Sequence, residues 1–269
     1  MVWLFALVGL CTPLLAAAAA VSIAPPSQPN LAPKLLRVAN GFIAPDGFNR
    51  SAVLVNGQHP APLLTGKKGM KFRFNVENAL TDPTMQRATS VHWHGLFQRG
   101  TNWADGPVGV SQCPISPQDS FLYEFTVNDQ AGTFWYHSHF SVQYCDGLRG
   151  PFVVYDDEDP HRHLYDVDNE STVITVGEWY HTPTPSILDV PLAHSTLING
   201  KGRSVSGPAV PLSVINVVKG KRYRFRLVSI ACDSNYMFSI DGHSLLVIAS
   251  GKKHMVMLCN VTDIGYVVQ

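Results

Sequence analysis

The 269-residue sequence has no excess of either charge, because its 20 basic residues balance its 20 acidic ones. A balanced chain lacks the basic surface that binds a phosphate backbone, so we expect no nucleic-acid partner. Beyond the opening segment, no stretch is long and apolar enough to cross a bilayer, and we expect no membrane span. Long runs with the 3.6-residue period of an amphipathic helix are also missing, which points away from a helical fold.

The opening segment is apolar and ends in small residues, a pattern typical of a secretory signal peptide at residues 1–20. No lysine or arginine precedes Lys34, so the usual positive start is missing. The alternative, a membrane anchor, is disfavoured by the length of the run and by Pro13. Residues 21–34 are rich in proline, serine and alanine, and we expect a flexible leader there. We therefore expect a secreted, extracellular protein.

Two further features agree with secretion. Candidate sequons for N-linked glycans start at Asn49, Asn169 and Asn260. Of the five cysteines, Cys11 lies in the signal segment. The others are expected to pair in an oxidising compartment, with three connectivities that spacing does not decide between: Cys113, Cys145, Cys232 and Cys259.

Short β-strand patterns, separated by glycine, proline and asparagine, fill most of the remaining chain. They lie at residues 51–55, 71–76, 121–127, 133–137, 151–155, 171–176, 213–218 and 222–228. These patterns indicate an all-β fold of the sandwich or barrel type. An acidic segment at 156–160 marks a domain boundary, so we expect a first domain over 35–158 and a second over 159–248. The second is short for a closed sandwich, and 249–269 forms a tail of different character.

The most informative motifs are two His-x-His pairs, His92-Trp93-His94 and His137-Ser138-His139. On a β-strand, side chains alternate between faces, so both histidines of a pair face the same way. Two such strands side by side would bring four imidazoles to one point. Imidazoles without a carboxylate favour copper or zinc over magnesium or calcium. The four histidines are therefore candidate metal ligands rather than hydrogen-bonded core residues. A third pair, His161 and His163, follows the acidic segment and is expected to be exposed.

The residues around the first two pairs resemble those of a known family. The segment 92–98 resembles the first copper signature of multicopper oxidases, and 132–151 resembles the second. Flanking blocks at 100–107, 112–115, 196–203 and 219–229 sharpen the resemblance to fungal, basidiomycete-type laccases. It runs from about Leu35 to Ile248. The resemblance implies cupredoxin-like (plastocyanin-like) Greek-key β-sandwich domains, one complete and a second incomplete.

The resemblance also implies a function. Laccases oxidise phenolic small molecules, as in lignin degradation, and reduce O2 to water with copper cofactors; no partner chain is implied. The family pattern assigns the type 2 copper to His92 and the type 3 coppers to His94, His137 and His139. It makes Asp105 a proton relay to oxygen, where the alternative is a turn residue. It makes Asp233 the acceptor of the phenol proton, where the alternative is an ordinary loop carboxylate.

Part of the family pattern is missing from the sequence. No His-Cys-His string and no His-Pro-x-His-x-His segment occurs, so the type 1 copper ligands are absent. The resemblance ends abruptly at Ala249, which a retained intron or shifted frame explains better than a genuine short isoform. We expect a truncated chain that is inactive alone.

The family pairs Cys145 with Cys232, a bridge that stabilises the fold by about 4.5 kcal/mol in the loop-entropy model. It leaves Cys113 free or paired with Cys259.

Three alternatives stay open. The chain could be a non-catalytic copper- or zinc-binding fragment, which the missing type 1 ligands favour. It could be another multicopper oxidase, such as a ferroxidase or ascorbate oxidase, although the context of Asp233 and the long laccase-like blocks argue against this. It could be a small laccase that completes its copper cluster between subunits, but such an enzyme needs a His-Cys-His segment from some chain.

Overall fold

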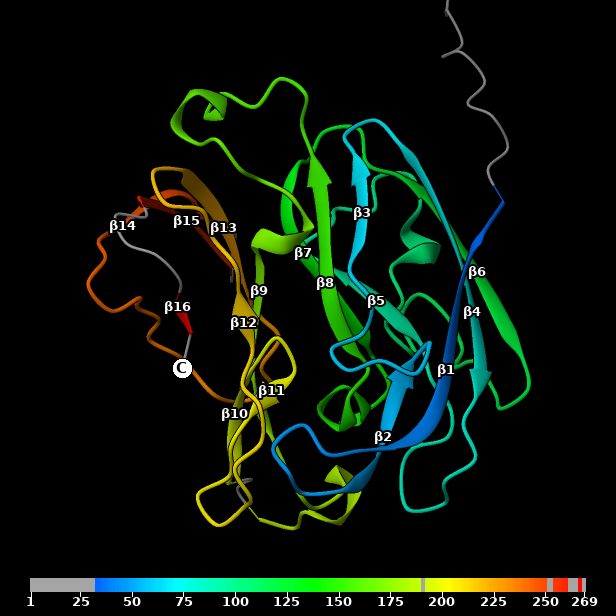
Figure 1. Cartoon of the computed structure of the whole chain (residues 1–269). Helices are drawn as coiled ribbons and strands as arrows, with labels where there is room; N and C mark the ends of the chain where they lie inside the picture. Colours follow the sequence, from blue (N-terminus) through cyan, green and yellow to red (C-terminus); the bar gives the residue numbers. More distant parts are fainter. Residues whose placement is uncertain (1–31, 190–191, 251–253, 261–265, 268–269) are drawn as a thin grey trace, which may run out of the picture. The chain divides into compact units, whose positions relative to one another are not determined.

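The computed structural model describes residues 32–189, 192–250, 254–260 and 266–267, with side chains described up to Ser250. Its regular structure consists of β-strands and short 3-10 helices (Figure 1), which confirms the all-β fold class. Among the described residues, no helix is long and apolar enough to span a membrane. From Leu31 onward the chain forms one compact unit. The domain boundary at residue 158 stays a prediction.

Two four-stranded sheets come first along the chain. One contains, in order, β2 (Arg50–Val55), β1 (Lys34–Ile43), β4 (Lys71–Ala79) and β6 (Ser120–Thr126). The other contains β3 (Leu64–Lys67), β8 (Arg149–Tyr155), β7 (Gly132–Ser138) and β5 (Val91–His94). The pairs β1–β4 and β3–β8 are parallel, and the other neighbours are antiparallel. β1 begins at Lys34, which the sequence analysis had placed at the end of the leader.

The hydrophobic core of this first part lies between the two sheets. Burial alternates strictly along β4, with Phe72, Phe74 and Val76 inside, as the polar–apolar alternation predicts. From the other sheet, the fully buried Trp93 of β5 stacks on Phe74 with ring centroids 4.8 Å apart. Trp93, which lies between His92 and His94, is thus part of the hydrophobic core. Because strand side chains alternate, both histidines lie on the opposite face of β5.

A six-stranded sheet follows. Its order is β11 (Lys201–Gly202), β10 (Ser195–Ile198), β9 (Val173–Trp179), β13 (Arg222–Ser229), β15 (His254–Asn260) and β14 (Leu245–Ser250). A separate pair contains β12 (Val214–Ile215) and β16 (Tyr266–Val267). The short 3-10 helices are η1 (Asn102–Ala104), η2 (Gln143–Asp146), η3 (Arg162–Leu164), η4 (Glu170–Thr172) and η5 (Thr184–Ser186).

Two strand predictions in the second part were too long. Ser171 and Thr172 belong to η4 and not to the strand, because the Asn169 side chain accepts the Ser171 backbone N–H and caps a 3-10 turn. The apolar pattern at 213–218 forms a strand only at Val214–Ile215. Local propensity cannot distinguish a strand from an extended segment that lacks a ladder partner.

Strand β7 is buried on both faces, which explains its continuous aromatic run. Phe134 and Tyr136 join the core of the sandwich. On the other face, Trp135 forms a second cluster with Val153 and with residues of the six-stranded part: Val173, Val228 and Ile230. The second histidine pair therefore lies at the end of a rigidly packed strand.

Candidate metal centre

The register between β5 and β7 brings the two histidine pairs together. The strands are antiparallel, and His92 lies directly opposite His137 across the ladder. His94 lies opposite Trp135, two residues before His137 and therefore on the same face of β7. The predicted convergence thus follows from one cross-strand register between segments more than forty residues apart in sequence.

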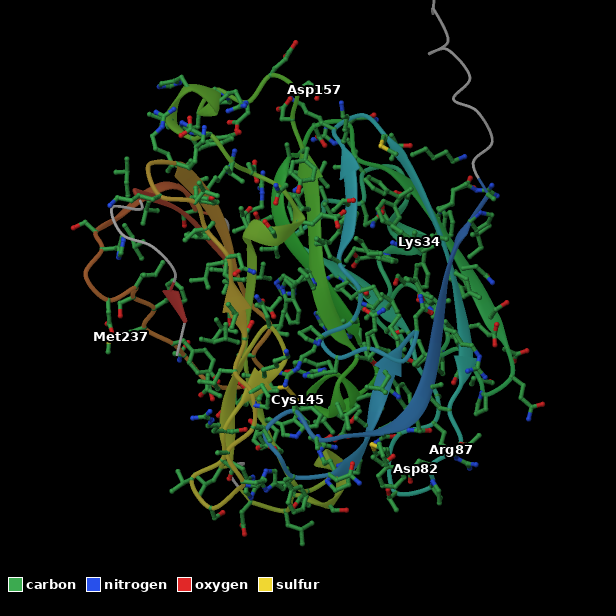
Figure 2. All side chains as sticks on the ribbon, in the orientation of Figure 1. Lys34, Asp82, Arg87, Cys145, Asp157 and Met237 are labelled. Carbon is green, nitrogen blue, oxygen red and sulfur yellow. A yellow bond between two sulfur atoms is a disulfide. The ribbon has the colours of Figure 1, made fainter. Side chains whose placement is uncertain are left out.

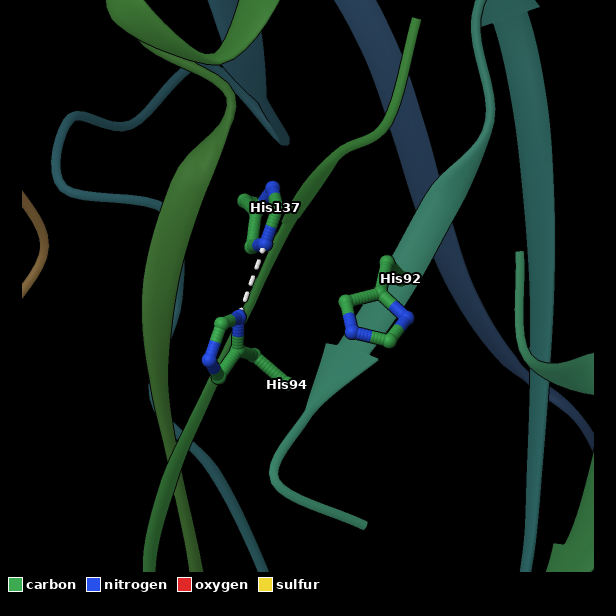
Figure 3. Close-up of side chains that lie close together, drawn as sticks. All are labelled: His92, His94 and His137. Carbon is green, nitrogen blue, oxygen red and sulfur yellow. Dashed lines mark hydrogen bonds between the residues drawn. The ribbon is translucent and has the colours of Figure 1, made fainter. Parts of the chain in front are cut away.

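Three of the four histidines converge closely enough to share a metal centre. Ring nitrogens of His92, His94 and His137 all lie within 4.8 Å of one another (Figure 3). The Nδ1 atom of His94 is 3.4 Å from the Nε2 atom of His137. Two imidazole nitrogens on one tetrahedral or trigonal metal, each at about 2.0–2.1 Å, lie about 3.3–3.6 Å apart. The donor set and its spacing fit a single ion between His94 and His137.

His139 is not part of this set of nitrogens, so the structure brings three of the four predicted ligands into the closest group. β7 ends at Ser138, before the exposed His139. The ring centroid of His139 lies 5.4 Å from that of His92 and 5.9 Å from that of His137, similar to the 5.5–5.6 Å between the rings of the other three. His139 therefore lies directly beside the group.

Backbone carbonyl groups orient two of the imidazoles. The Nδ1 atom of His92 donates to the Asp105 carbonyl at 2.7 Å, and Nδ1 of His137 donates to the Ser138 carbonyl at 2.8 Å. Because a carbonyl oxygen only accepts, Nδ1 carries the proton in both rings and Nε2 keeps its lone pair. Such hydrogen bonds hold the tautomer and the ring direction that a metal requires.

The protonation of the two oriented rings also suits metal binding. Burial lowers the pKa of His92, against the opposing effects of the Asp105 carbonyl and carboxylate. Burial likewise holds the pKa of His137 well below its usual range. Neutral imidazole is the ligating form, so binding at neutral pH displaces no proton from either ring.

Asp105, predicted as a proton relay, lies next to the group. It ends η1, and its carboxylate Oδ1 is 3.4 Å from Nδ1 of His92. The carboxylate is partly exposed and lines a cleft of about 1280 Å³ together with His92, His94, Phe97 and Trp103. It can therefore exchange protons with solvent while remaining beside the imidazole cluster.

Asp233 is not brought into the histidine group. It is exposed and directly follows Cys232, one of the residues that line a smaller cleft of about 350 Å³ over the histidines. Cys232 is held by a disulfide to Cys145 of η2 (Cys145 is labelled in Figure 2). This is the pairing that the resemblance implied. Cys113 is free and exposed, and the alternative partner Cys259 lies outside the residues with described side chains.

Two residues of the centre were missed by the sequence reasoning. Trp135 stacks on His137 with ring centroids 4.1 Å apart, and its ring lies 5.0 Å from that of His94. Its spacing of two residues from His137 was the available signal. Gly106 has φ +98°, and a Cβ atom there would lie 1.9 Å from the Val91 carbonyl oxygen. The turn after Asp105 can approach β5 only with glycine.

Comparisons with known proteins identify a family. Family profiles described as multicopper oxidase match residues 37–159 and 170–264, so the second match continues past Ala249, where we expected the resemblance to end. Laccase-2 of Trametes versicolor is 65% identical over 214 residues, which are 79% of this chain and 41% of that protein. Laccase-2 of Fomitopsis schrenkii is 53% identical over 260 residues, which are 96% of this chain and 48% of that protein.

Solved structures give the same result. A laccase from Botrytis aclada matches with a TM-score of 0.72 and 33% identity, covering 86% of this chain and 47% of that one. Fet3p, described as a multicopper oxidase that functions in iron import, matches with a TM-score of 0.69 and 26% identity, covering 86% of this chain and 46% of that one. The cupredoxin-like fold class is therefore confirmed.

The chain belongs to the multicopper oxidase family. Within it, the chain is similar to laccases of Trametes and Pleurotus, the latter at 57% identity over 230 residues. The family implies copper cofactors, which the imidazole donor set fits. The chain spans less than half the length of these curated relatives.

Proposed function

We propose that this chain contributes part of the oxygen-reducing copper centre of a secreted laccase, which oxidises phenolic substrates and reduces O2 to water. The observation that carries the proposal is the group of three ring nitrogens within 4.8 Å, held on adjoining strands of a multicopper oxidase fold. The identity to laccases supports phenols as the substrate class.

The division of the histidines between copper ions follows the family pattern. His94 and His137, whose nitrogens are 3.4 Å apart, would hold one type 3 copper. His139, beyond the end of β7, would hold the other type 3 copper, and His92 would hold the type 2 copper through Nε2, since its Nδ1 is bonded to the Asp105 carbonyl. Bound copper would supply one-electron redox steps. Imidazole suits both of its oxidation states.

The two carboxylates have separate tasks. Asp105, with a partly exposed carboxylate beside His92, passes protons from solvent toward the centre. Asp233, exposed next to the disulfide, accepts the proton of a phenol that gives up an electron. Neither task requires either carboxylate to be a metal ligand.

The 269 residues contain no His-Cys-His string, so they carry no thiolate–imidazole set for a type 1 copper. We propose that these residues alone bind copper without oxidising phenols, and that the type 1 ligands come from residues outside this sequence. Secretion is supported by the apolar opening segment and by the disulfide. The sequon residues Asn49 and Asn169 are both exposed, as a glycan requires, whereas the side chain of Asn260 is not described.

The test is a copper titration of the purified chain, with His94→Ala and His137→Ala as variants and His163→Ala, on the exposed part of η3, as the control. We expect Cu²⁺ binding in the parent and the control, a loss of affinity of at least about tenfold in each variant, and no intense blue absorption. Equal affinity in all four proteins would remove the metal assignment. A blue protein that oxidises phenols would overturn the proposal that this chain has no turnover alone. A protein that oxidises ferrous iron instead would overturn the proposed substrate class.

A further inference from the structure

Gln143, the first residue of η2, has its whole hydrogen-bonding capacity engaged in the protein interior. The residue is completely buried. Its Oε1 atom accepts from the hydroxyls of Thr89 and Ser138, each at 2.6 Å. Its Nε2 atom donates to the carbonyls of Gln86 and Ala88, each at 2.9 Å. An amide side chain can make about four hydrogen bonds, and all four are present.

The partners of Gln143 lie on one histidine-bearing strand and on the segment that precedes the other. Ser138 stands between His137 and His139 and is the last residue of β7. Residues 86–89 lead directly into β5, where His92 lies. One buried side chain therefore joins the end of the second His-x-His strand to the beginning of the first.

This link acts where the β-ladder stops. The pair Val91–Ser138 is the last one between β5 and β7. Next to it, the backbone N–H of His139 donates to the Ser90 carbonyl at 3.3 Å, a long hydrogen bond. The Ser138 hydroxyl, fixed by Gln143, also accepts the Phe140 backbone N–H at 3.2 Å. The direction in which His139 leaves the strand thus depends on how Ser138 is held.

We propose that Gln143 is a positioning residue of the copper centre, which sets the separation between the two histidine pairs without binding metal itself. The inference rests on the proposed function, because it takes the histidines as ligands. Without the amide, two buried hydroxyls and two partly buried carbonyls would each lose a hydrogen bond, and the strand ends would shift to form new ones. Loss of a group that supports metal ligands lowers metal affinity by about 10–100-fold.

The test compares Gln143→Met with a matched variant of another buried amide, Asn78→Leu. Asn78 is also completely buried and donates to the Arg87 and Ile115 carbonyls, each at 2.8 Å. Asn78 thus bonds to the same 86–89 segment as Gln143 but has no bond to Ser138, so the comparison isolates the link to β7. In the full chain, we expect both variants to lower the denaturant midpoint. Only Gln143→Met should raise the Cu²⁺ dissociation constant by about 10–100-fold, measured against a competing chelator. An unchanged Cu²⁺ dissociation constant in Gln143→Met overturns the inference, and so does an equal rise of that constant in Asn78→Leu.

A milder variant distinguishes the positioning role from misfolding. A measurement without metal distinguishes failure of the inference from failure of the proposed function. Thr89→Val keeps Gln143 and the shape of the side chain, and should raise the dissociation constant less than Gln143→Met does. Without metal, amide hydrogen exchange at Ser138 and His139 should be faster in Gln143→Met than in Asn78→Leu. Equal exchange rates contradict the inference. A parent chain that binds no Cu²⁺ but shows this exchange difference would remove the copper assignment and keep the positioning role of Gln143.

Discussion

At the residue scale, the protein places several histidines where burial disfavours the charged ring and lowers the pKa. His59 is half-buried, its ring lies 4.9 Å from that of Trp179, and its Nδ1 donates to the Gly147 carbonyl at 3.2 Å. Burial, and then the positive charge of Arg149, lower the pKa of His59 to about 3. This residue looks isolated in the sequence, and only the contacts of the folded chain show that it carries a pH effect.

The pH dependence of stability follows from that shift. An unfolded histidine titrates near 6.5, so between pH 6.5 and 3 the unfolded chain binds a proton that folded His59 does not. The stabilisation is complete above pH 6.5 and decreases as the pH falls. We expect His59 to account for a loss of about 1–2 kcal/mol between pH 7 and 5. Denaturant unfolding of His59→Gln should show a flatter pH profile, while His163→Gln should match the parent; identical profiles for all three would refute the effect.

At the element scale, the centre depends on strand β5 and on the turn that packs against it. The alternation of β5 was readable from the sequence, because Trp93 is apolar and its neighbours are histidines. The approach of the Asp105–Gly106 turn to Val91 was not readable, since the two segments meet only through tertiary packing. An alternating sequence pattern predicts which face of a strand a side chain lies on. It does not predict which other segment of the chain packs against that face.

Gly106→Ala tests that close approach, with Gly100→Ala as its control. Both glycines have positive φ, +98° and +75°, but a Cβ atom meets the Val91 carbonyl only at Gly106, and nothing lies within 4 Å at Gly100. We expect Gly100→Ala to cost about 1 kcal/mol from backbone strain alone. Gly106→Ala should cost about 1–3 kcal/mol more and weaken Cu²⁺ binding, because β5 is displaced. Equal losses of stability in Gly106→Ala and Gly100→Ala would mean that the Asp105–Gly106 turn shifts without displacing β5.

At the scale of the whole molecule, the two sandwich sheets and the six-stranded sheet are joined near the centre by buried contacts. The Cys145–Cys232 disulfide spans a sequence separation of 87 residues. Beside it, the buried Arg149 guanidinium donates to Glu178 at 3.2 Å and to the Ile230 carbonyl at 2.7 Å. The same region lines the smaller cleft over the histidines, so its order also shapes access to the centre.

Removal of the disulfide should therefore be costly. For a separation of 87 residues, loop closure predicts that Cys145→Ser with Cys232→Ser lowers the free energy of unfolding by up to about 4.5 kcal/mol. Cys113→Ser, at an exposed free cysteine, should leave it unchanged. Equilibrium denaturation of the three proteins is the measurement. A double variant as stable as the parent would show that packing between the sheets, rather than the bridge, holds this region.

The sequence by itself determined most β-strands of the first sandwich, although not β1 or β3, the shared face of His92 and His94 on β5 and, through family resemblance, the Cys145–Cys232 bridge. These features depend on local alternation or on long motifs, which are present in the chain before it folds. Only the tertiary structure decided that His94 and His137 lie 3.4 Å apart, that the ring of His139 lies 5.4 Å from that of His92, and that Gln143 joins β7 to the segment before β5. Those facts depend on cross-strand register and on buried partners from distant segments, and no local pattern encodes the identity of such a partner.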